Sequence, residues 1–423
     1  MFIIYNLIFF IFMLGYLPIY LLRGKFHRGF ARRLGFLPDN LKLDNPIWIH
    51  AVSVGEAIAV KGLVAELRKA YPQKRLVIST VTATGNKLAE SLIAEGDFLT
   101  YLPLDFSFLV KHVLKQVNPC MFIIAETEIW PNLITCLYKQ KIPVITVNGR
   151  ISDSSYSGYR AIKFFIRPIL NKITKFCVQS GTDAQRLQNL GVDKNKIQVT
   201  GNVKFDINLE VVSQIDALSY RQKLMFGQGD KLLICGSTHP KEEEIIFEAY
   251  KQLLIIFPQM KLLIAPRHPE RSKGIAKLAV DNGFTPVLIS DILNLSLASI
   301  SRPVFILNII GELFNYYSAA DIVFIGGSFV KTGGHNILEP ASLNKPVIFG
   351  PHMYNFRDIS ELFLKNKAAF MVFDADELAA KIKEIIESDS LVQGIVARAR
   401  ELIIKNRGAN KRNIQVIWDL NLI

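Results

Sequence analysis

The sequence predicts an α/β protein with two domains, each built on a parallel β-sheet covered by helices. Short apolar runs of strand length alternate with segments of helical periodicity, and this alternation is interrupted once before it restarts. Size agrees, because a chain of 423 residues that is 50% hydrophobic can bury two cores of ordinary dimensions.

In the first domain, seven apolar runs are expected to be strands. Each leads into a polar or Gly-containing turn and then into a helical pattern, which is typical of a parallel sheet. For example, Asp105 and Ser107 are expected to open a helix that ends near residue 117. The seven runs cover residues 47–52, 75–79, 98–103, 120–125, 144–147, 176–179 and 197–199.

The segment 207–230 is polar and weakly patterned, so we place the domain boundary there. The expected domains are 23–206 and 207–423, and the last helix could pack back on the first domain. A cleft between them is the expected ligand site, because ligands bind at the carboxyl ends of strands in open α/β sheets. The strands expected in the second domain cover residues 231–235, 260–265, 285–289, 303–307, 321–325 and 347–349.

The chain is basic, with a net charge of +13 and a pI near 9.4. This balance favours anionic partners such as phosphorylated substrates, an anionic membrane or nucleic acid. The charges are spread over both domains and no nucleic-acid module is recognisable, so we expect no nucleic-acid partner. The four cysteines are scattered without a C-x-x-C pair, which fits a reduced compartment and argues against a disulfide framework.

Residues 2–22 contain no charged side chain and are nearly all apolar, a length that can span a bilayer as a helix. A buried core helix is the alternative. Several cations follow directly, and by the positive-inside rule they place the downstream chain in the cytoplasm. We therefore expect a single-pass membrane anchor at 2–22. The cations are Arg23, Lys25, Arg28, Arg32 and Arg33.

A second segment that could touch a membrane lies at 156–167, where basic and aromatic residues alternate at helical spacing. Such a helix could lie on an acidic lipid surface. Equally, its aromatic side chains could face the core while its cations face water. The sequence leaves both alternatives open.

The first candidate site residue is Glu56. An apolar strand, a turn through Gly55 and a helical pattern meet here, so the carboxylate is expected at the carboxyl end of a strand. Ser53-x-x-Glu56 also fits a capping box, which is a sufficient structural reason for the Glu. The positive end of the helix dipole is expected to keep this carboxylate ionised at pH 7 and able to accept a proton.

The second domain carries a pattern suited to a phosphate. Arg267 and His268 follow a strand directly, and Arg can hold a phosphate by two parallel hydrogen bonds. Glycines at 326–327 and 333–334 allow close backbone approach. A helix that begins near His335 or Asn336 is expected to aim its N–H groups at a phosphate. Glu339 could then accept from ribose hydroxyls, and His239 could also touch the ligand.

Together these motifs resemble the bacterial 3-deoxy-D-manno-octulosonic acid (Kdo) transferases, in order, from the N-terminus to about residue 360. The resemblance implies a GT-B glycosyltransferase with two Rossmann-like domains. It also implies metal-independent, inverting transfer of Kdo from CMP-Kdo to the lipid A precursor, lipid IVA, at the inner face of the inner membrane, without a cofactor. The motifs are Ser53-Val-Gly-Glu56, Glu126-Thr-Glu-Ile-Trp-Pro-Asn132, Gly201-Asn-Val-Lys204, Pro266-Arg-His-Pro269, Gly311-Glu-Leu313 and Gly333-Gly-His-Asn-Ile-Leu-Glu339.

The resemblance assigns roles position by position. Glu56 matches the general base, and Glu126 and Lys204 match residues that stabilise the transition state. For Glu126 a purely structural ion pair or hydrogen bond is the alternative, and Glu128 could carry that structural role instead. The nucleotide-binding positions are Arg267, His268, Gly311, Glu312, Leu313, Asn336, Ile337, Leu338 and Glu339.

Two alternatives remain at this level. One is a GT-B enzyme that uses another nucleotide sugar, and the other is a protein that binds nucleic acid or membrane without catalysis. Asp374-Ala-Asp376 spells the D-x-D of metal-dependent glycosyltransferases. It stands directly before a helical pattern, so we interpret it as a helix cap and expect no metal site.

Overall fold

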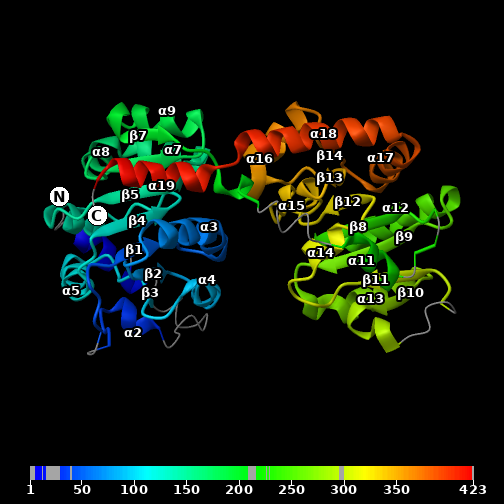
Figure 1. Ribbon diagram of the computed structural model, residues 1–423, viewed down its shortest axis with the longest axis horizontal. Helices are drawn as coiled ribbons and strands as arrows, with labels where there is room; N and C mark the ends of the chain where they lie inside the picture. Colours follow the sequence, from blue (N-terminus) through cyan, green and yellow to red (C-terminus); the bar gives the residue numbers. More distant parts are fainter. Residues whose placement is uncertain are drawn as a thin grey trace. The chain divides into compact units, whose positions relative to one another are not determined.

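The computed structural model describes residues 5–11, 13–15, 29–38, 41–207, 216–224, 226–227, 229–294 and 300–421. Two compact units result (Figure 1). Unit 1 comprises Met1–Asp206 together with Asn406–Ile423, and unit 2 comprises Ile207–Lys405. The prediction of two parallel-sheet α/β domains is confirmed.

Unit 1 is built on a seven-stranded sheet in the order β3-β2-β1-β4-β5-β6-β7, and every pairing is parallel. Five of the strands are buried along their whole length or nearly so, because helices cover both faces. All seven predicted strands are present. They are β1 (Ile47–His50), β2 (Leu76–Thr80), β3 (Phe98–Tyr101), β4 (Met121–Ala125), β5 (Val144–Gly149), β6 (Lys175–Val178) and β7 (Ile197–Val199).

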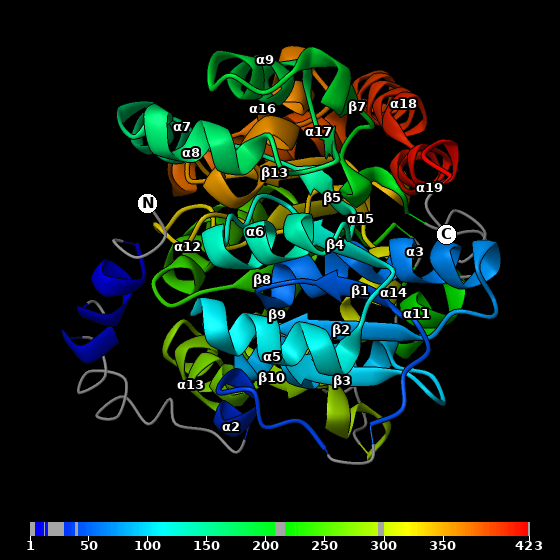
Figure 2. The same cartoon turned by 90° about the vertical axis from the view of Figure 1, so that its left-hand side faces the viewer.

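The helices of unit 1 follow the strands in sequence. In Figure 2, α5 and α6 lie over the strands β1 to β4. On this face Trp48 packs edge-on against Phe122, with ring centroids 5.2 Å apart. The helices are α2 (Phe30–Arg33), α3 (Val54–Ala70), α4 (Ala83–Ala89), α5 (Ser107–Val117), α6 (Pro131–Lys139), α7 (Asp153–Ala161), α8 (Lys163–Leu170) and α9 (Gly181–Asn189).

The last helix, α19 (Ala409–Asp419), belongs to unit 1 and packs against α3 (red in Figure 1). Its apolar side chains Ile414, Val416 and Ile417 are buried in the core on that face of the sheet. Asp206 caps its N-terminus, because the carboxylate accepts from the backbone N–H groups of Gly408 at 2.5 Å, Ala409 at 3.2 Å and Asn410 at 2.7 Å.

Unit 2 repeats the architecture with the order β10-β11-β9-β8-β12-β13-β14, again parallel throughout. The six predicted strands are present. The seventh has only two residues and was not predicted. The strands are β8 (Leu232–Thr238), β9 (Lys261–Pro266), β10 (Thr285–Leu288), β11 (Pro303–Ile306), β12 (Ile322–Ile325), β13 (Val347–Phe349) and β14 (Phe370–Met371).

Helices flank this second sheet, and α12 and α17 pack against each other. The core of unit 2 is separate from that of unit 1 and is formed by residues such as Phe247, Ile264 and Phe324. The helices are α11 (Ala217–Lys223), α12 (Glu242–Ile256), α13 (Ser272–Asp281), α14 (Leu313–Tyr317), α15 (Leu338–Ser342), α16 (Arg357–Lys365), α17 (Ala375–Glu387) and α18 (Asp389–Asn406).

The predicted anchor at 2–22 lies largely outside the described residues, which include only 5–11 and 13–15 of it, in helical conformation. Among the helices described, none has the length and apolarity needed to cross a bilayer. The described part contacts the rest of unit 1, because the Tyr5 hydroxyl donates to the Asp105 carboxylate at 2.9 Å.

The helix predicted to open at Asp105 and Ser107 is confirmed, because α5 begins at Ser107 and ends at Val117. The Asp105 side chain does not cap it but accepts the N–H groups of Asn132 at 3.0 Å and Leu133 at 2.8 Å, in the first turn of α6. These amides have no partner within their own helix, and the buried carboxylate supplies one across the fold.

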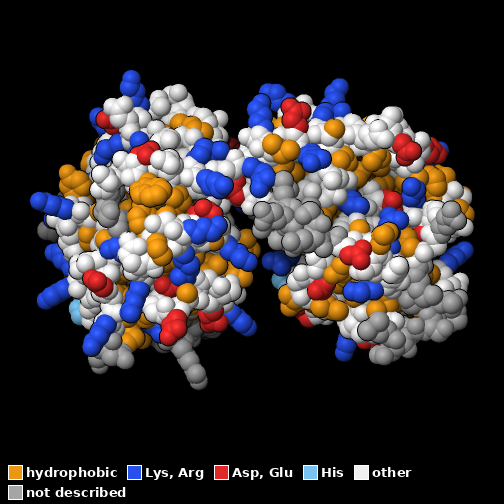
Figure 3. Space-filling model, in the orientation of Figure 1, with side chains coloured by type: hydrophobic (Ala, Val, Ile, Leu, Met, Phe, Trp, Pro, Cys, Tyr) orange, Lys and Arg blue, Asp and Glu red, His pale blue; other side chains and the backbone are white. Residues whose placement is uncertain are grey.

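Lys and Arg side chains are distributed over both units on the face drawn in Figure 3, and no single basic patch dominates that face. Apolar side chains are exposed in the described part of the N-terminal helix, among them Leu7, Ile8, Ile11 and Leu14. Phe164 at the start of α8 is 82% exposed as well.

Candidate active site

Glu56 lies in the first turn of α3, directly after strand β1. Ser53 is the N-cap, and its hydroxyl oxygen accepts the Glu56 N–H at 3.5 Å. In return, the Glu56 carboxylate accepts the Ser53 hydroxyl at 3.1 Å and the Val52 N–H at 2.7 Å. The predicted cap is therefore present, although the backbone amide bound is that of Val52 and not that of Ser53.

The capping hydrogen bonds leave the Glu56 carboxylate able to accept a proton. A carboxylate has about four lone-pair positions, and these contacts use two of them. Glu56 is 9% exposed, so the carboxylate is fixed and largely shielded from water. Such a group can accept a proton from a hydroxyl that is brought to its remaining lone pairs.

The expectation that the helix dipole keeps Glu56 fully ionised at pH 7 is wrong. Burial, the largest cause, and the charges of Glu126 and Glu128 together raise the pKa of Glu56 from 4.5 to about 7. The hydrogen bonds from Val52 and Ser53 oppose this shift but do not cancel it. Desolvation therefore outweighs the cap, and the carboxyl group titrates near neutral pH.

Glu126 follows strand β4, whose neighbour in the sheet is β1. Its φ is +57°, the left-handed region that is uncommon for residues other than Gly. The Glu126 N–H donates to the Val147 carbonyl at 2.9 Å, and the next residue, Thr127, accepts the Arg150 N–H at 3.0 Å. Strained backbone held by its surroundings is a feature of functional sites.

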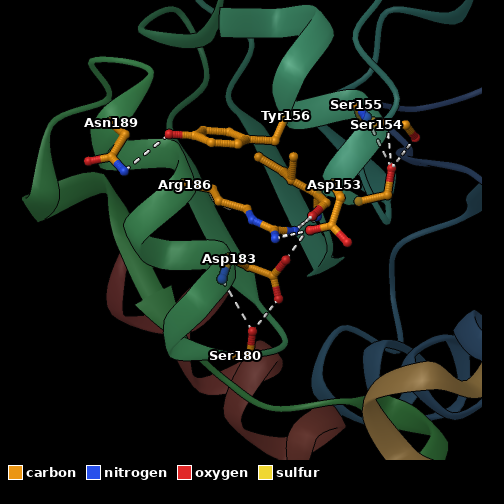
Figure 4. Close-up of polar contacts among 10 residues, drawn as sticks. Asp153, Ser154, Ser155, Tyr156, Ser180, Asp183, Arg186 and Asn189 are labelled. Atoms are coloured by element: carbon orange, nitrogen blue, oxygen red, sulfur yellow. Dashed lines mark hydrogen bonds and ion pairs between the residues drawn. The ribbon is translucent and has the colours of Figure 1, made fainter.

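Helix α7 lies next to this loop. The Glu128 carboxylate raises the pKa of Tyr159 on α7, after burial, which is the larger cause. Figure 4 shows how α7 is held to α9: the Arg186 guanidinium bonds to Asp153 and lies over the Tyr156 ring at 5.6 Å. Asn189 donates to the Tyr156 hydroxyl at 3.2 Å.

The open question about 156–167 is answered in part by this packing. Tyr156, Tyr159 and Phe165 pack against the core, as the structural alternative required. Arg160, Lys163 and Phe164 are exposed.

Lys204 lies in a short 3₁₀ helix, Val203–Phe205, after the edge strand β7. This turn packs against both α3 and α19. Its N-terminal side is held by Asn148, whose side-chain oxygen accepts the Val203 N–H at 3.1 Å. Glu56, Glu126 and Lys204 thus all follow the carboxyl ends of strands in one sheet, with the helix that carries Glu56 in contact with the Lys204 turn.

In unit 2, Arg267 and His268 follow strand β9 and both are exposed. The Arg267 N–H donates to the Thr238 carbonyl at 3.0 Å, which joins the ends of β9 and β8. A second imidazole, that of His239, lies edge-on to His268 with ring centroids 6.2 Å apart. His335, from the loop after β12, joins them through His239.

Glu242 and Glu243 were not predicted to belong to this site, yet both are buried at the start of α12. The Glu242 carboxylate accepts four backbone N–H groups, from His239 at 2.9 Å and from three residues of the turn after β12. Glu243 binds the Arg271 guanidinium through both carboxylate oxygens, at 2.8 and 3.0 Å. The turn amides are those of Gly327, Ser328 and Phe329 at 2.6, 2.9 and 2.8 Å.

The helix predicted to begin near His335 or Asn336 begins instead at Leu338 and has five residues. Its first N–H is taken by the Asn336 side-chain oxygen at 3.0 Å. That this segment holds a phosphate stays a prediction. The Asn336 amide also donates to Glu339 at 3.1 Å, and burial raises the pKa of Glu339.

The second predicted nucleotide segment, 311–313, begins with Gly311 at φ +91° and leads into α14. The Glu312 carboxylate accepts the Tyr220 hydroxyl at 3.2 Å and the Asn315 amide at 3.3 Å. Leu313 is the first residue of the helix.

The interpretation of Asp374 as a helix cap is confirmed. Its carboxylate accepts the Glu377 N–H at 2.9 Å at the start of α17, and Asp376 accepts from Gln252 at 2.7 Å. Within the described ranges, no three His, Cys, Asp or Glu side chains are placed to hold a metal ion together.

Comparison with known proteins gives independent evidence on the family of this chain. Residues 28–207 match the family model of the 3-deoxy-D-manno-octulosonic-acid transferase (kdotransferase). The 3-deoxy-D-manno-octulosonic acid transferase of Haemophilus influenzae is 34% identical over 398 residues, which is 93% of this chain and 91% of the relative. That of Chlamydophila psittaci is 33% identical, over 81% of this chain and 78% of the relative.

Among solved structures, a glycosyltransferase from Rickettsia africae is similar with a TM-score of 0.60 at 17% sequence identity. The match covers 88% of this chain and 98% of that one. At this identity the likeness shows the fold, two parallel-sheet α/β domains of the glycosyltransferase type.

Proposed function

Because the chain belongs to the 3-deoxy-D-manno-octulosonic acid (Kdo) transferases, we propose that it transfers Kdo from CMP-Kdo to the lipid A precursor, lipid IVA, with inversion at the anomeric carbon and without a metal ion. The observation that carries this proposal is the Glu56 carboxyl group. It is buried, fixed by two hydrogen bonds and titrates near pH 7. Those are the properties of a general base that must be ionised often enough to accept a proton.

In this reaction Glu56 removes the proton from the acceptor hydroxyl as the hydroxyl oxygen attacks the anomeric carbon. The bond from that carbon to the phosphate oxygen breaks, and CMP leaves with the electron pair. One base is sufficient for an inverting transfer, because the leaving phosphate is a stable anion and needs cations in place of an acid.

Glu126 and Lys204 are proposed to stabilise the charges that develop. Glu126 is held in a strained conformation after β4, the neighbour of the strand β1 that precedes Glu56, and its charge acts on Glu56. A carboxylate there can balance positive charge on an oxocarbenium-like sugar, and the Lys204 ammonium group can balance negative charge on the phosphate.

Unit 2 is proposed to bind the CMP-Kdo donor. Arg267 and His268 are exposed at the carboxyl end of β9, where a guanidinium can bind a phosphate by two hydrogen bonds. Glu339, whose other contact is Asn336, supplies an oxygen suited to a ribose hydroxyl. The neighbouring segments 311–313 and 336–338 complete the proposed nucleotide site.

We place the enzyme at the inner membrane with its two units on the cytoplasmic side. The uncharged segment 2–22 and the cations that follow it support this proposal. Exposed apolar side chains in the described part of that segment, such as Leu7 and Ile11, support it as well.

The test is transfer of labelled Kdo from CMP-Kdo to lipid IVA. Glu56→Gln keeps an oxygen that can accept the Val52 N–H, so the helix start is preserved. We expect kcat to fall at least about a hundredfold, the lower end for loss of a general base, while CMP binding is unchanged. The matched control is Glu95→Gln, an exposed carboxylate of the same unit, which should behave as wild type.

Three results would count against the proposal. An unchanged rate in Glu56→Gln would remove Glu56 as the base. Absence of transfer by folded wild-type protein would reject the donor or the acceptor. Loss of transfer after addition of a chelator would reject a metal-independent reaction.

A further inference from the structure

Two imidazoles face each other at the carboxyl end of the unit 2 sheet. His239 comes directly after strand β8, and His335 lies in the loop after β12. Their Nε2 atoms are 2.9 Å apart and their rings are nearly parallel, with 9° between planes and 5.2 Å between centroids. The pair is hydrogen-bonded. His239 was expected only to touch the ligand, and His335 was given no role of its own.

The contact between the two Nε2 atoms determines which ring nitrogens carry protons. Two bare nitrogens repel and two N–H groups collide, so the bridge holds one proton. The imidazole that accepts through Nε2 must carry its own hydrogen on Nδ1. The neutral pair therefore presents one Nδ1–H group and one bare Nδ1. If the pair gains one more proton, both Nδ1 atoms become donors and the pair carries a positive charge.

The burial and the cations around the pair favour its neutral form in the absence of an anion. The two buried carboxylates of α12 are already engaged, Glu242 by backbone amides and Glu243 by Arg271. Burial is the first cause that lowers the pKa of both imidazoles, that of His335 to about 4, and the charges of His268 and Arg267 act in the same direction. For His239 the Arg271 charge also lowers the pKa, whereas the Glu243 carboxylate raises it.

The remaining titratable groups near the pair belong to neighbouring elements. Glu270 lies 3.6 Å from the His268 ring and is exposed. His352 follows β13, and its carbonyl lies near Gly334 in the same loop as His335. Lys331 of that loop is exposed. Of these groups, the cations disfavour an added positive charge and so favour the neutral pair, whereas the Glu270 carboxylate does not.

Four backbone N–H groups of the turn beside the pair are not available to hold a phosphate. In many Gly-rich sites the amides of the turn bind the anion. In this turn the N–H groups of Gly327, Ser328 and Phe329 all donate to Glu242. The Gly334 N–H donates to the Gly327 carbonyl at 2.7 Å. These four N–H groups are therefore engaged within the protein, so side chains are needed in their place.

We propose that the His239–His335 pair takes up one proton when the donor's phosphate binds and then holds that phosphate as a charged two-imidazole donor, a step that rests on the proposed function because the anion is the phosphate of CMP-Kdo. Bond breaking makes this useful. When the phosphate oxygen takes the electron pair of the glycosidic bond, the phosphate gains a second negative charge. A positive pair beside it stabilises that charge and adds to Arg267.

The experiment measures CMP binding to the full-length protein by calorimetry in buffers with different ionisation enthalpies. At about pH 8 the CMP phosphate is already dianionic, because its second pKa is about 6. Wild-type protein should take up about one proton per CMP, and the dissociation constant should rise about tenfold per pH unit above neutrality. Cytidine, which lacks the phosphate, should bind without proton uptake.

Variants identify the group that takes up the proton. His239→Asn and His335→Asn should each abolish the uptake and the pH dependence of CMP binding. The matched control is His268→Asn, which removes a neighbouring imidazole but leaves the bridge. It should bind CMP more weakly yet still take up the proton.

The outcomes separate the two proposals. If folded wild-type protein does not bind CMP, the proposed function fails. If CMP binds without proton uptake, or if uptake persists in both bridge variants, the two-imidazole donor is wrong. Should a bridge variant fail to fold, the ring-nitrogen NMR signals of the wild type decide, because CMP must then convert both Nδ1 atoms to N–H groups.

Discussion

The Glu56 carboxylate accepts from the Val52 amide and the Ser53 hydroxyl, and the burial that fixes it also raises its pKa to about 7. A raised pKa means that the folded protein holds the proton more tightly than an unfolded chain does. The base form is therefore lost as the pH falls through about 7, and not through the ordinary value of 4.5.

We expect a pH profile that reports this shift. For wild-type enzyme, kcat/KM should fall about tenfold per pH unit on the acidic side of pH 7. Glu128→Gln removes one of the charges that raise the pKa of Glu56, so the acidic limb should move to lower pH. The profile of Glu95→Gln should coincide with that of wild type. An unmoved limb in Glu128→Gln would show that a different group sets it.

For single residues, the sequence predicted positions better than protonation states. The position of Glu56 and its cap follow from four consecutive residues. Its pKa depends on burial by distant segments and on two carboxylates some 70 residues away, so local pattern reasoning could not supply it. Glu242 and Glu243 were missed because adjacent carboxylates suggest a solvated helix start, although they continue the buried stripe of Ile246 and Phe247.

Strands were the most predictable elements, because most strands of these parallel sheets are buried along their length and appear as apolar runs. Strand β14, with two residues, is too short to produce such a run. Helix α15 was placed too early because its start depends on the Asn336 side chain and not on periodicity. The three-dimensional contacts of the loops decide these boundaries.

The start of α12 yields a test at the scale of elements. Glu242→Ala leaves four backbone N–H groups without their acceptor, so unit 2 should lose about 1.5–3 kcal/mol or more of stability. The matched control is Glu244→Ala, an exposed neighbour. All three tryptophans, Trp48, Trp130 and Trp418, belong to unit 1. Urea unfolding followed by circular dichroism should therefore shift, while the tryptophan fluorescence transition stays in place.

The cap of α19 predicts the opposite pattern. Asp206→Ala removes the acceptor for the Gly408 and Asn410 amides and should cost about 1–2 kcal/mol in unit 1. Tryptophan fluorescence should now report an earlier transition. Asp216→Ala, which removes the cap of α11 in unit 2, is the control and should leave that transition unchanged. Equal effects of the two variants on fluorescence would contradict this assignment.

For the whole molecule, length and alternation predicted two parallel-sheet α/β domains, and each unit has its own core. The segment 406–423 completes unit 1 from the far end of the chain. Helix α19 contacts α3 across some 350 positions of the chain. Such a contact leaves no local pattern, so periodicity alone gives no information on where α19 packs.

A chain that ends at residue 405 should therefore damage one unit selectively. It lacks Ile414, Val416 and Ile417, which are buried against α3. Fluorescence of Trp48 and Trp130 should show unit 1 unfolding at lower urea, since each lost side chain of this kind costs about 2–5 kcal/mol. CMP binding by unit 2 should be retained. Loss of CMP binding together with the fluorescence transition would contradict two independent cores.

The return of α19 also sets the order in which the protein can mature on the ribosome. Unit 1 is begun first, but the helix that covers α3 is translated only after the whole of unit 2. At bacterial elongation rates of roughly 5–20 residues per second, about 200 residues take roughly 10–40 s. During that time the apolar face of α3 remains uncovered on the nascent chain and accessible to chaperones. Unit 1 is therefore begun first and completed last.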